Sequence, residues 1–302
     1  MFNILFKSIF RDISNHLRFN NSNGGSEMMV NMSGDRVKKI DLECESIFIK
    51  YLENNNLNIV GYISEETDTL KYFKQISVDI AKDMYIVSFD PLDGSSNYTS
   101  NINTGSIYAI YRYNHITCKL IDVIHSGYCL YGINSVMVYT DNDKVIHSLL
   151  TEHGDFIKLN ELKFDIMSNK PKVYSINESN DYDPEIRFLI QQYKAKQYNM
   201  RWVGTLVADA HRILLNDGIF YYPLTSKNPN GKIRMLYESI PLAYIFKLAG
   251  GVGLNSSYTN ILDRISLFDI NKPHTASGII LASNTEYRHL MYLLELYEIN
   301  KQ

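Results

Sequence analysis

The sequence predicts a layered α/β fold, an α+β arrangement of helix and sheet layers, and three observations lead to this class. The chain has 302 residues, 45% hydrophobic and 21% charged, a balance typical of a folded protein with a large core. Segments rich in β-branched and aromatic residues alternate with segments of helical periodicity. The alternation continues on both sides of a polar link at residues 167–171. We expect a domain boundary there, between residues 1–168 and 169–302.

In the first half, helices are expected where apolar residues recur at three- and four-residue spacing. Residues 4–17 and 35–51 show this pattern, and a polar, glycine-rich loop is expected between them at 20–26. Strands are expected where short apolar runs are bounded by turn residues. These runs lie at residues 57–64, 84–89, 106–113, 127–131 and 135–139.

The second half repeats the alternation. Strands are expected at residues 172–176, 219–222 and 279–282. Helices are expected at residues 203–215, 239–248 and 285–297. Gly250 and Gly251 follow the helix at 239–248 after one alanine, as is typical of a helix C-terminus.

Composition excludes several classes of protein. The formal net charge is -3, so no basic excess favours nucleic acid as a partner. No apolar run approaches the roughly 18 residues of a membrane span, and no signal-peptide cleavage site follows the first residues. The three cysteines are widely spaced, which favours free thiols over a disulfide framework or a zinc site. We therefore expect a cytoplasmic protein.

The sharpest local feature is the octapeptide DPLDGSSN at residues 90–97, directly after the strand at 84–89. Asp90 and Asp93 can point into one space from a strand end, and magnesium prefers oxygen ligands of this kind. Backbone N–H groups of residues 94–96 can form a cradle for phosphate. This combination suits metal-assisted hydrolysis of a phosphoester. A plain turn is the alternative, because Asp, Pro, Gly, Ser and Asn all favour turns.

The octapeptide resembles the signature of the fructose-1,6-bisphosphatase family, within the lithium-sensitive, metal-dependent phosphatases of sugars and inositols. Further segments match in order: GDRVKKID (34–41), SEE (64–66), YSINE (174–178), RWVG (201–204), VAD (207–209), GIFYYP (218–223) and GKIRMLYE (231–238). The resemblance extends from residue 33 to the C-terminus. It implies the sandwich fold of that family and magnesium-dependent hydrolysis of the 1-phosphate of fructose 1,6-bisphosphate, a gluconeogenic reaction that gives fructose 6-phosphate and phosphate.

The resemblance also implies a cage for two or three Mg²⁺ ions, a site that Mn²⁺ or Zn²⁺ could also occupy. The matching ligands are Glu65, Glu66, Asp90, Asp93, Glu238 and the Leu92 carbonyl. The electrostatics of these residues also favours a metal site, since clustered carboxylates repel one another unless cations neutralise them. For the glutamate pair at 65–66 taken alone, an exposed and solvated pair is the alternative.

Catalytic roles are implied in the same way. Asp41 and Glu66 resemble the pair that activates the attacking water, and Arg234 resembles an arginine that orients the metal cage. Asp35 matches a loop that closes when metals bind, together with the lysines at 38 and 39. A solvated basic helix start is the alternative for that segment.

The substrate site follows from the resemblance too. The reacting phosphate would contact Asp93, Gly94, Ser95 and Ser96, and the second phosphate would lie among Asn177, Arg201, Trp202, Tyr222 and Lys232. In the family, the arginine that matches Arg201 reaches into a neighbouring subunit's site, which implies a homo-oligomer, expected to be a tetramer. Trp202 departs from the family's tyrosine, so an N–H donor replaces a hydroxyl.

The resemblance also gives expectations about inhibition by AMP and about the roles of two further side chains. The family's AMP-binding turn has no counterpart before Phe2, and Met84 replaces a lysine of that site, although Tyr85 and Arg112 match it. We therefore expect no inhibition by AMP. His211 is expected to have a structural role, and the tyrosine at position 237 is expected to pack in the core.

Three alternatives remain open for function. A sedoheptulose-1,7-bisphosphatase, or an enzyme with both activities, is the nearest one. An inositol monophosphatase fits less well, because Arg201, Tyr222 and Lys232 together suit a second phosphate. A catalytically silent regulatory relative would be expected to lose at least one of the matched carboxylates, and all of them are present.

Overall fold

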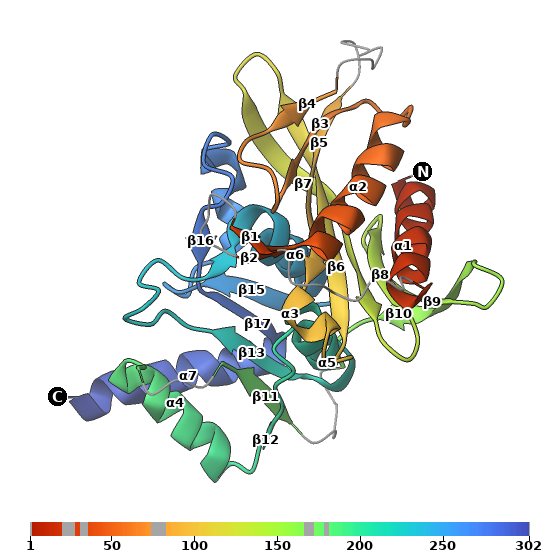
Figure 1. Cartoon of the computed structure of the whole chain (residues 1–302). Helices are drawn as coiled ribbons and strands as arrows, with labels where there is room; N and C mark the ends of the chain where they lie inside the picture. The colour runs from red at the N-terminus through yellow and green to blue at the C-terminus, as the bar shows by residue number, and fades with distance from the viewer. Residues whose placement is uncertain are drawn as a thin grey trace.

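The computed structural model describes residues 2–19, 28–30, 36–73, 83–165, 172–177 and 181–301. Two sheets and three layers of helices alternate through the molecule, which confirms the predicted layered class (Figure 1). The link predicted at 167–171 lies outside the described residues, so the domain boundary stays a prediction. No described helix is long and apolar enough to span a membrane.

Helices α1 (Phe2–Phe19) and α2 (Lys39–Glu53) form the first outer layer, against an eight-stranded sheet. The strand order is β10-β9-β8-β7-β6-β5-β3-β4, with β3 and β5 parallel. Their bounds are β3 (Ile59–Ser64), β4 (Lys71–Tyr72), β5 (Met84–Asp93), β6 (Thr104–Asn114), β7 (Lys119–Tyr131), β8 (Val136–Asp141), β9 (Lys144–Leu150) and β10 (Phe156–Leu162). Apolar helix faces cover the sheet. Phe6 stacks on Tyr108 and Phe48 on Phe89, all four fully buried.

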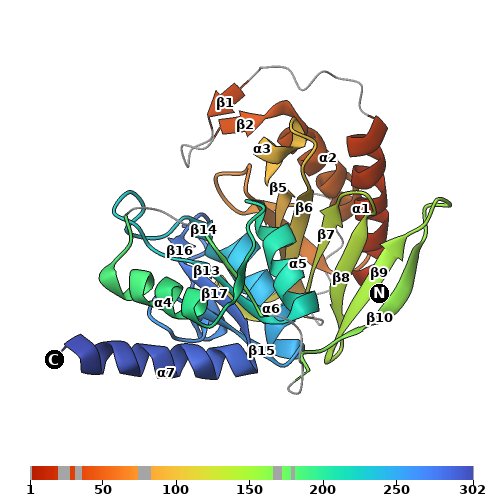
Figure 2. The same cartoon turned by 90° about the horizontal axis from the view of Figure 1, so that it is seen from below.

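The middle layer lies between the two sheets (Figure 2). It contains α5 (Leu206–Asn216), a single π-helical turn (Met235–Ser239) and α6 (Ile240–Leu248). Hydroxyl groups of Ser88 and Tyr111, from the first sheet, donate hydrogen bonds of 2.8 and 2.6 Å to the Leu236 carbonyl. These buried bonds fix the π-helical turn against β5 and β6. Turns of this kind occur frequently at functional sites.

The second sheet has five strands in the order β12-β11-β13-β17-β15. Their bounds are β11 (Val173–Ile176), β12 (Asn199–Met200), β13 (Gly218–Tyr222), β15 (Gly251–Asn255) and β17 (Ile279–Ser283). Helices α4 (Pro184–Ala195) and α7 (Asn284–Lys301) cover its outer face and form the last layer (Figure 1). Two short pairs complete the described strands: β1 (Met28–Val30) with β2 (Arg36–Lys38), and β14 (Ile233–Arg234) with β16 (Ala276–Ser277).

Most predicted elements are confirmed within one to a few residues, but the predicted start of the second helix is wrong. This helix begins at Lys39 and not at residue 35, because residues 36–38 pair with β1 as strand β2. The predicted loop at 20–26 lies outside the described residues. Strands β9 and β10, strand β15 and helix α4 were not predicted. The sequence of β10 has only a weak strand pattern, because its first and last residues are buried and the five residues between them are exposed.

Two glycines with positive φ lie at the start of strands of the second sheet or just before them, and they test how closely the backbone is packed there. Gly218 has φ 138°, and a Cβ there would lie 2.1 Å from the Val173 carbonyl oxygen. Gly250 has φ 87°, but a Cβ there would meet nothing within 4 Å. We expect Gly250→Ala to lower the free energy of unfolding by about 1 kcal/mol through backbone strain, and Gly218→Ala by roughly 3 kcal/mol or more through strain and overlap. Urea denaturation checks both, and equal losses would contradict the assigned overlap.

Candidate active site

A cavity of about 690 Å³ lies where the first sheet, the middle helices and the second sheet meet. Strands β3 and β5 run parallel, so their carboxyl ends reach the same edge of the sheet, where ligands commonly bind. Of the predicted site residues, Asp35 lies outside the described residues and Arg201 does not line the cavity. The others all line it: Asp41, Glu65, Glu66, Asp90, Leu92, Asp93, Gly94, Ser95, Ser96, Asn177, Trp202, Tyr222, Lys232, Arg234 and Glu238.

Three buried carboxylates form one part of the cavity wall. Ligand oxygens of Asp90, Asp93 and Glu238 all lie within 4.8 Å of one another. Burial raises the pKa of Asp90 well above its ordinary value, and the neighbouring Glu65 raises it further. Burial also raises the pKa of Asp93 to about 7 and that of Glu238 well above its ordinary value. The folded chain therefore holds these groups at a distance where their negative charges repel.

Backbone N–H groups fix the orientation of each carboxylate. Asp90 accepts from the Leu92 N–H at 3.0 Å, and Glu238 accepts from the Arg234 N–H at 2.5 Å. Asp93 accepts from two N–H groups in the first turn of α5, from Leu206 at 3.2 Å and Val207 at 2.6 Å. The helix start favours a negative charge. These donors are neutral, so they orient the cluster without cancelling its charge.

The cluster fits a divalent cation. Hard cations such as Mg²⁺ take several carboxylate and carbonyl oxygens, and a cation would remove the mutual repulsion that raises these pKa values. Glu65 is close enough to raise the pKa of all three buried carboxylates. Together with Glu66 and the Leu92 carbonyl, it lines the same end of the cavity.

The alternative that residues 90–93 form a plain turn is wrong, because they belong to β5, with an irregular register opposite β6. The chain turns at Gly94, where φ is 72°. A Cβ at this position would lie 2.4 Å from the Thr205 hydroxyl oxygen. Glycine is therefore required for the close approach of this turn to the start of α5. The short helix α3 (Ser95–Tyr98) follows, and its first N–H groups have no acceptor within the helix.

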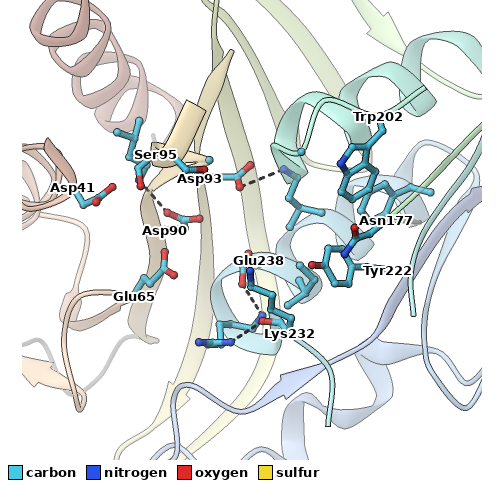
Figure 3. Close-up of a pocket in the computed structure, with 18 of the residues that line it drawn as sticks. Asp41, Glu65, Asp90, Asp93, Ser95, Asn177, Trp202, Tyr222, Lys232 and Glu238 are labelled. Atoms are coloured by element: carbon cyan, nitrogen blue, oxygen red, sulfur yellow. Dashed lines mark hydrogen bonds between the residues drawn. The ribbon is translucent and has the colours of Figure 1, made fainter. Parts of the chain in front are cut away.

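The opposite end of the cavity is aromatic and polar (Figure 3). Asp41, Glu65, Asp90 and Asp93 lie on one side of the view and Trp202, Tyr222 and Asn177 on the other, with Glu238 and Lys232 between them. The Trp202 ring is nearly parallel to Phe220, with centroids 6.0 Å apart. The two residues after Trp202, 203 and 204, donate their backbone N–H groups to the Asp209 carboxylate in hydrogen bonds of 2.9–3.1 Å. This buried carboxylate fixes the segment that carries the indole.

Arg201 is exposed outside this end of the cavity. Its guanidinium donates a hydrogen bond of 2.8 Å to the Met200 carbonyl. Asp41, by contrast, is only 4% exposed in the first turn of α2 and faces the carboxylate end of the cavity. His211 does not line the cavity. It is buried against the Tyr128 hydroxyl, and burial lowers its pKa to about 4, as suits the structural role predicted for it.

Sequence reasoning missed two residues that lie near the turn after β3, of which His274 is hydrogen-bonded to it. Tyr237 is fully buried, as predicted, and its hydroxyl also lies 2.8 Å from Nδ1 of His274. Nε2 of His274 lies 2.9 Å from the Thr67 carbonyl oxygen, which can only accept. In its neutral form, the ring therefore carries its proton on Nε2, and Nδ1 accepts from the tyrosine. Glu45, on the buried face of α2, lies near Ser64 of the same turn. No local motif marks either residue, because their partners are distant in sequence.

Comparison with known proteins gives a consistent result. Residues 2–161 match the family profile described as the N-terminal domain of fructose-1,6-bisphosphatase, and residues 167–295 match its C-terminal domain. The fructose-1,6-bisphosphatase 1 of Rattus norvegicus is 34% identical over 288 residues, which cover 90% of this chain and 75% of the rat protein. A class 1 fructose-1,6-bisphosphatase of a Sulfurihydrogenibium species is 34% identical over 256 residues, covering 79% of this chain and 76% of that protein.

Two solved structures are also similar to this chain over nearly its whole length. Leishmania major fructose-1,6-bisphosphatase in its holo form superposes with a TM-score of 0.85 at 27% identity, over 97% of this chain and 93% of that one. The T-state of the same Leishmania enzyme gives a TM-score of 0.79 over 96% and 91% of the two chains.

The raised pKa of Asp93 predicts how metal-free stability depends on pH. A carboxyl group whose pKa is about 7 when folded and near 3.9 when unfolded stabilises the folded state below pH 4. This contribution is lost as pH rises through 7. In EDTA, we expect the melting temperature of Asp93→Asn to fall less between pH 5 and pH 8 than that of the parent protein. Mg²⁺ at pH 8 should raise the melting temperature of the parent more than that of the variant. Parallel pH curves for the two proteins would show that Asp93 does not titrate as described.

Proposed function

The chain belongs to the fructose-1,6-bisphosphatase family, and from this membership we propose that it hydrolyses the 1-phosphate of fructose 1,6-bisphosphate. Water adds to phosphorus, the bond from phosphorus to the C1 oxygen breaks, and a proton passes to that oxygen. The products are fructose 6-phosphate and phosphate. The observation that carries the proposal is the lining of one cavity, in which clustered carboxylates lie on one side, Asn177 and Tyr222 lie on the other, and Lys232 lies between them.

We assign the carboxylate end to Mg²⁺, with Glu65, Glu66, Asp90, Asp93, Glu238 and the Leu92 carbonyl as the ligands. The raised pKa values of the three buried carboxylates support this assignment, because a cation would relieve their repulsion. When bound, such ions would stabilise the negative charge that develops on the phosphoryl and leaving oxygens.

The chain's own groups then orient the reactants. Asp41 and Glu66 would accept the proton of the attacking water, since both carboxylates line the carboxylate end of the cavity. Backbone N–H groups of residues 94–96 would hold the oxygens of the reacting phosphate. Arg234 would orient Glu238, whose carboxylate accepts from its backbone N–H. Asp35 keeps its proposed role in loop closure, although it lies outside the described residues.

The far phosphate would bind among Asn177, Tyr222 and Lys232, with Trp202 as a further wall. Cationic, amide and hydroxyl donors suit a phosphate dianion. An indole can donate one hydrogen bond and cannot accept one, so Trp202 would contact a phosphate oxygen only through Nε1. Under this proposal, residues 169–302 bind the sugar bisphosphate and residues 1–168 supply most of the metal ligands.

We also propose a homo-oligomer, a tetramer by family resemblance, in which Arg201 serves a neighbouring subunit's cavity. The exposure of Arg201 outside its own cavity supports this, because within the described residues its guanidinium donates a hydrogen bond to the adjacent Met200 carbonyl and to no group of the cavity. A surface arginine is well suited to bind a phosphate of the next subunit through two N–H groups.

The expectation that AMP does not inhibit is supported by contacts at the other end of the first sheet. Arg112 lies 3.4 Å from a carboxylate oxygen of Asp83 and 3.7 Å from one of Asp122, so its charge is already matched. Tyr85 packs edge-on against Phe2, and the methionine at position 84 is buried.

One experiment tests the proposed substrate. Phosphate release is measured side by side from fructose 1,6-bisphosphate and sedoheptulose 1,7-bisphosphate, with Mg²⁺. A higher kcat/KM for the fructose ester supports the proposal. A higher value for the sedoheptulose ester favours the alternative enzyme, and no release from either favours a silent relative.

We expect Asp93→Asn to lower kcat more than tenfold without unfolding the protein. Asparagine keeps the shape and one acceptor for the α5 N–H groups but loses the negative charge of the cage. Asp83→Asn, just before β5 and exposed, is the matched control and should leave kcat unchanged. Circular dichroism checks the fold. If Asp93→Asn keeps more than about a tenth of the turnover, a loss below roughly 1.4 kcal/mol, the metal-cage assignment is wrong.

We expect Arg201→Ala to raise KM more than it lowers kcat. The far phosphate does not react, so its binding energy is nearly equal in the ground state and the transition state. Arg187→Ala, an exposed arginine on α4, is the control. Mixing Arg201→Ala with inactive Asp93→Asn protein should restore activity if subunits share sites. An unchanged KM with a large loss of kcat would contradict the assigned role.

A further inference from the structure

The N–H cradle assigned above to the reacting phosphate, residues 94–96, lies between two contacts with the start of α5. Before the cradle, the carboxylate of Asp93 accepts from two N–H groups in the first turn of that helix. After the cradle, Nδ2 of Asn97 donates a hydrogen bond of 2.8 Å to the hydroxyl oxygen of Thr205. The same helix start therefore holds the chain on both sides of the cradle.

Thr205 directly precedes α5 and is fully buried. Its hydroxyl donates a hydrogen bond of 2.7 Å to the carbonyl of Asn103, just before β6. Gly94 packs against the same side chain, since a Cβ at Gly94 would lie 2.4 Å from the hydroxyl oxygen and 3.0 Å from the threonine Cβ. One hydroxyl therefore joins three segments that are distant in the sequence: the octapeptide, the start of β6 and the start of α5.

Chemistry determines the direction of these hydrogen bonds. The Val203 carbonyl can only accept, and its oxygen lies 3.4 Å from the side-chain nitrogen of Asn97, so the amide turns its nitrogen toward α5. The Asn103 carbonyl can also only accept, so it takes the single proton of the Thr205 hydroxyl. The lone pairs of the hydroxyl oxygen are then available to the Asn97 amide. Without this hydroxyl, Asn97 would keep only the longer bond to Val203.

We propose that Thr205 is a positioning residue that sets the orientation of the N–H cradle toward the reacting phosphate. Asn97 transmits this effect, because its own N–H donates to the Gly94 carbonyl at 2.8 Å. Its carbonyl accepts from the N–H groups of residues 100 and 102, both at 3.1 Å. A displacement of the Asn97 side chain is therefore passed to the turn that forms the cradle. The proposal rests on the proposed function for the role of that cradle.

Helix capping does not account for the Thr205 hydroxyl. A threonine at this position ordinarily accepts a hydrogen bond from an N–H group in the first turn of its own helix. The side chain of Thr205 makes no such bond, and N–H groups of that turn bind Asp93 instead. Packing alone does not account for the hydroxyl either, because valine would fill the same space without burying a polar atom. What the hydroxyl adds is the link to Asn97 and Asn103.

The test uses variants of the full-length protein. Thr205→Val removes the hydroxyl and keeps the shape, Thr205→Ser keeps the hydroxyl, and Asn97→Ala removes the other side of the link. Thr140→Val is the matched control. The Thr140 hydroxyl is also buried and accepts a backbone N–H, from Ser126 at 3.0 Å, but it lies on β8 and does not line the cavity.

Four properties are measured for each protein. They are the melting temperature, kcat and KM for fructose 1,6-bisphosphate, Mn²⁺ affinity without substrate by electron paramagnetic resonance, and affinity for inorganic phosphate by calorimetry. The calorimetry is done with and without Mg²⁺. The part of the phosphate affinity that depends on Mg²⁺ reports the cradle, because the cradle is the phosphate site next to the carboxylate end of the cavity.

We expect Thr205→Val to lower kcat about tenfold or more, with a smaller factor in KM, because the oxygens of the reacting phosphate are no longer held in line. The Mg²⁺-dependent phosphate affinity should fall about fivefold, while Mn²⁺ affinity stays within about twofold, since the backbone donors to Asp93 remain. Thr205→Ser should keep most of the kcat. Asn97→Ala combined with Thr205→Val should be no worse than the lower single variant, because both changes break one link.

A folded Thr205→Val protein whose kcat and Mg²⁺-dependent phosphate affinity stay within about twofold of the parent would overturn the proposal. Equal losses in Thr140→Val would also overturn it, since they would reflect lower stability alone. So would a Mn²⁺ affinity that falls as far as kcat, which would connect the hydroxyl to the metal ligands. If Thr205→Val does not fold, Asn97→Ala decides the question in the same way.

The phosphate measurement separates this proposal from the proposed function. A parent protein that binds phosphate with Mg²⁺ but does not hydrolyse fructose 1,6-bisphosphate would refute the proposed function alone. The phosphate affinities of the variants would then still test whether Thr205 positions the cradle.

Discussion

Repulsion among the buried carboxylates of Asp90, Asp93 and Glu238 is the constraint on which the rest of the site depends. Charges taken out of water and placed this close destabilise a folded chain unless other groups compensate. The chain orients them with neutral N–H donors from three separate backbone segments, and the charge of Arg234 lowers the pKa of Glu238 without offsetting the effect of burial. It thereby fixes where the charges lie and leaves their neutralisation to a cation. The sheets and the π-helical turn are rigid supports against which such a strained cluster can be held.

The first turn of α5 connects the two ends of the cavity. On one side, the N–H groups of Leu206 and Val207 hold the carboxylate of Asp93. On the other side, the carboxylate of Asp209 accepts from the backbone of the preceding segment and fixes Trp202. One helix start therefore sets the distance between the carboxylate end and the aromatic end. A substrate with two anionic groups needs such a fixed separation, because each group must reach its own donors at the same time.

Local patterns explain how much of this could be predicted from the sequence. The octapeptide at 90–97 is contiguous, and the strand before it has a clear apolar pattern, so Asp90, Asp93 and the layered class followed from residues alone. Glu65 and Glu238 needed family resemblance, since isolated glutamates carry no signal of burial. His274 could not be found, because its partner Thr67 is about 200 residues away in the sequence. The π-helical turn was also missed, since its cause is tertiary: two hydroxyls of the first sheet bind one carbonyl.

The carboxylates of the cavity divide into two groups by the backbone that carries them. Asp90, Asp93 and Glu238 are 2–9% exposed and belong to a central strand and a helical turn. Glu65 and Glu66 are half-buried and belong to a turn, a type of segment that moves more easily than strands do. A turn that lines a site needs restraints beyond its own hydrogen bonds. The contact of His274, distant in sequence, with the Thr67 carbonyl supplies one such restraint. The rigid group can then define where a cation binds, and the restrained turn can complete the site around it.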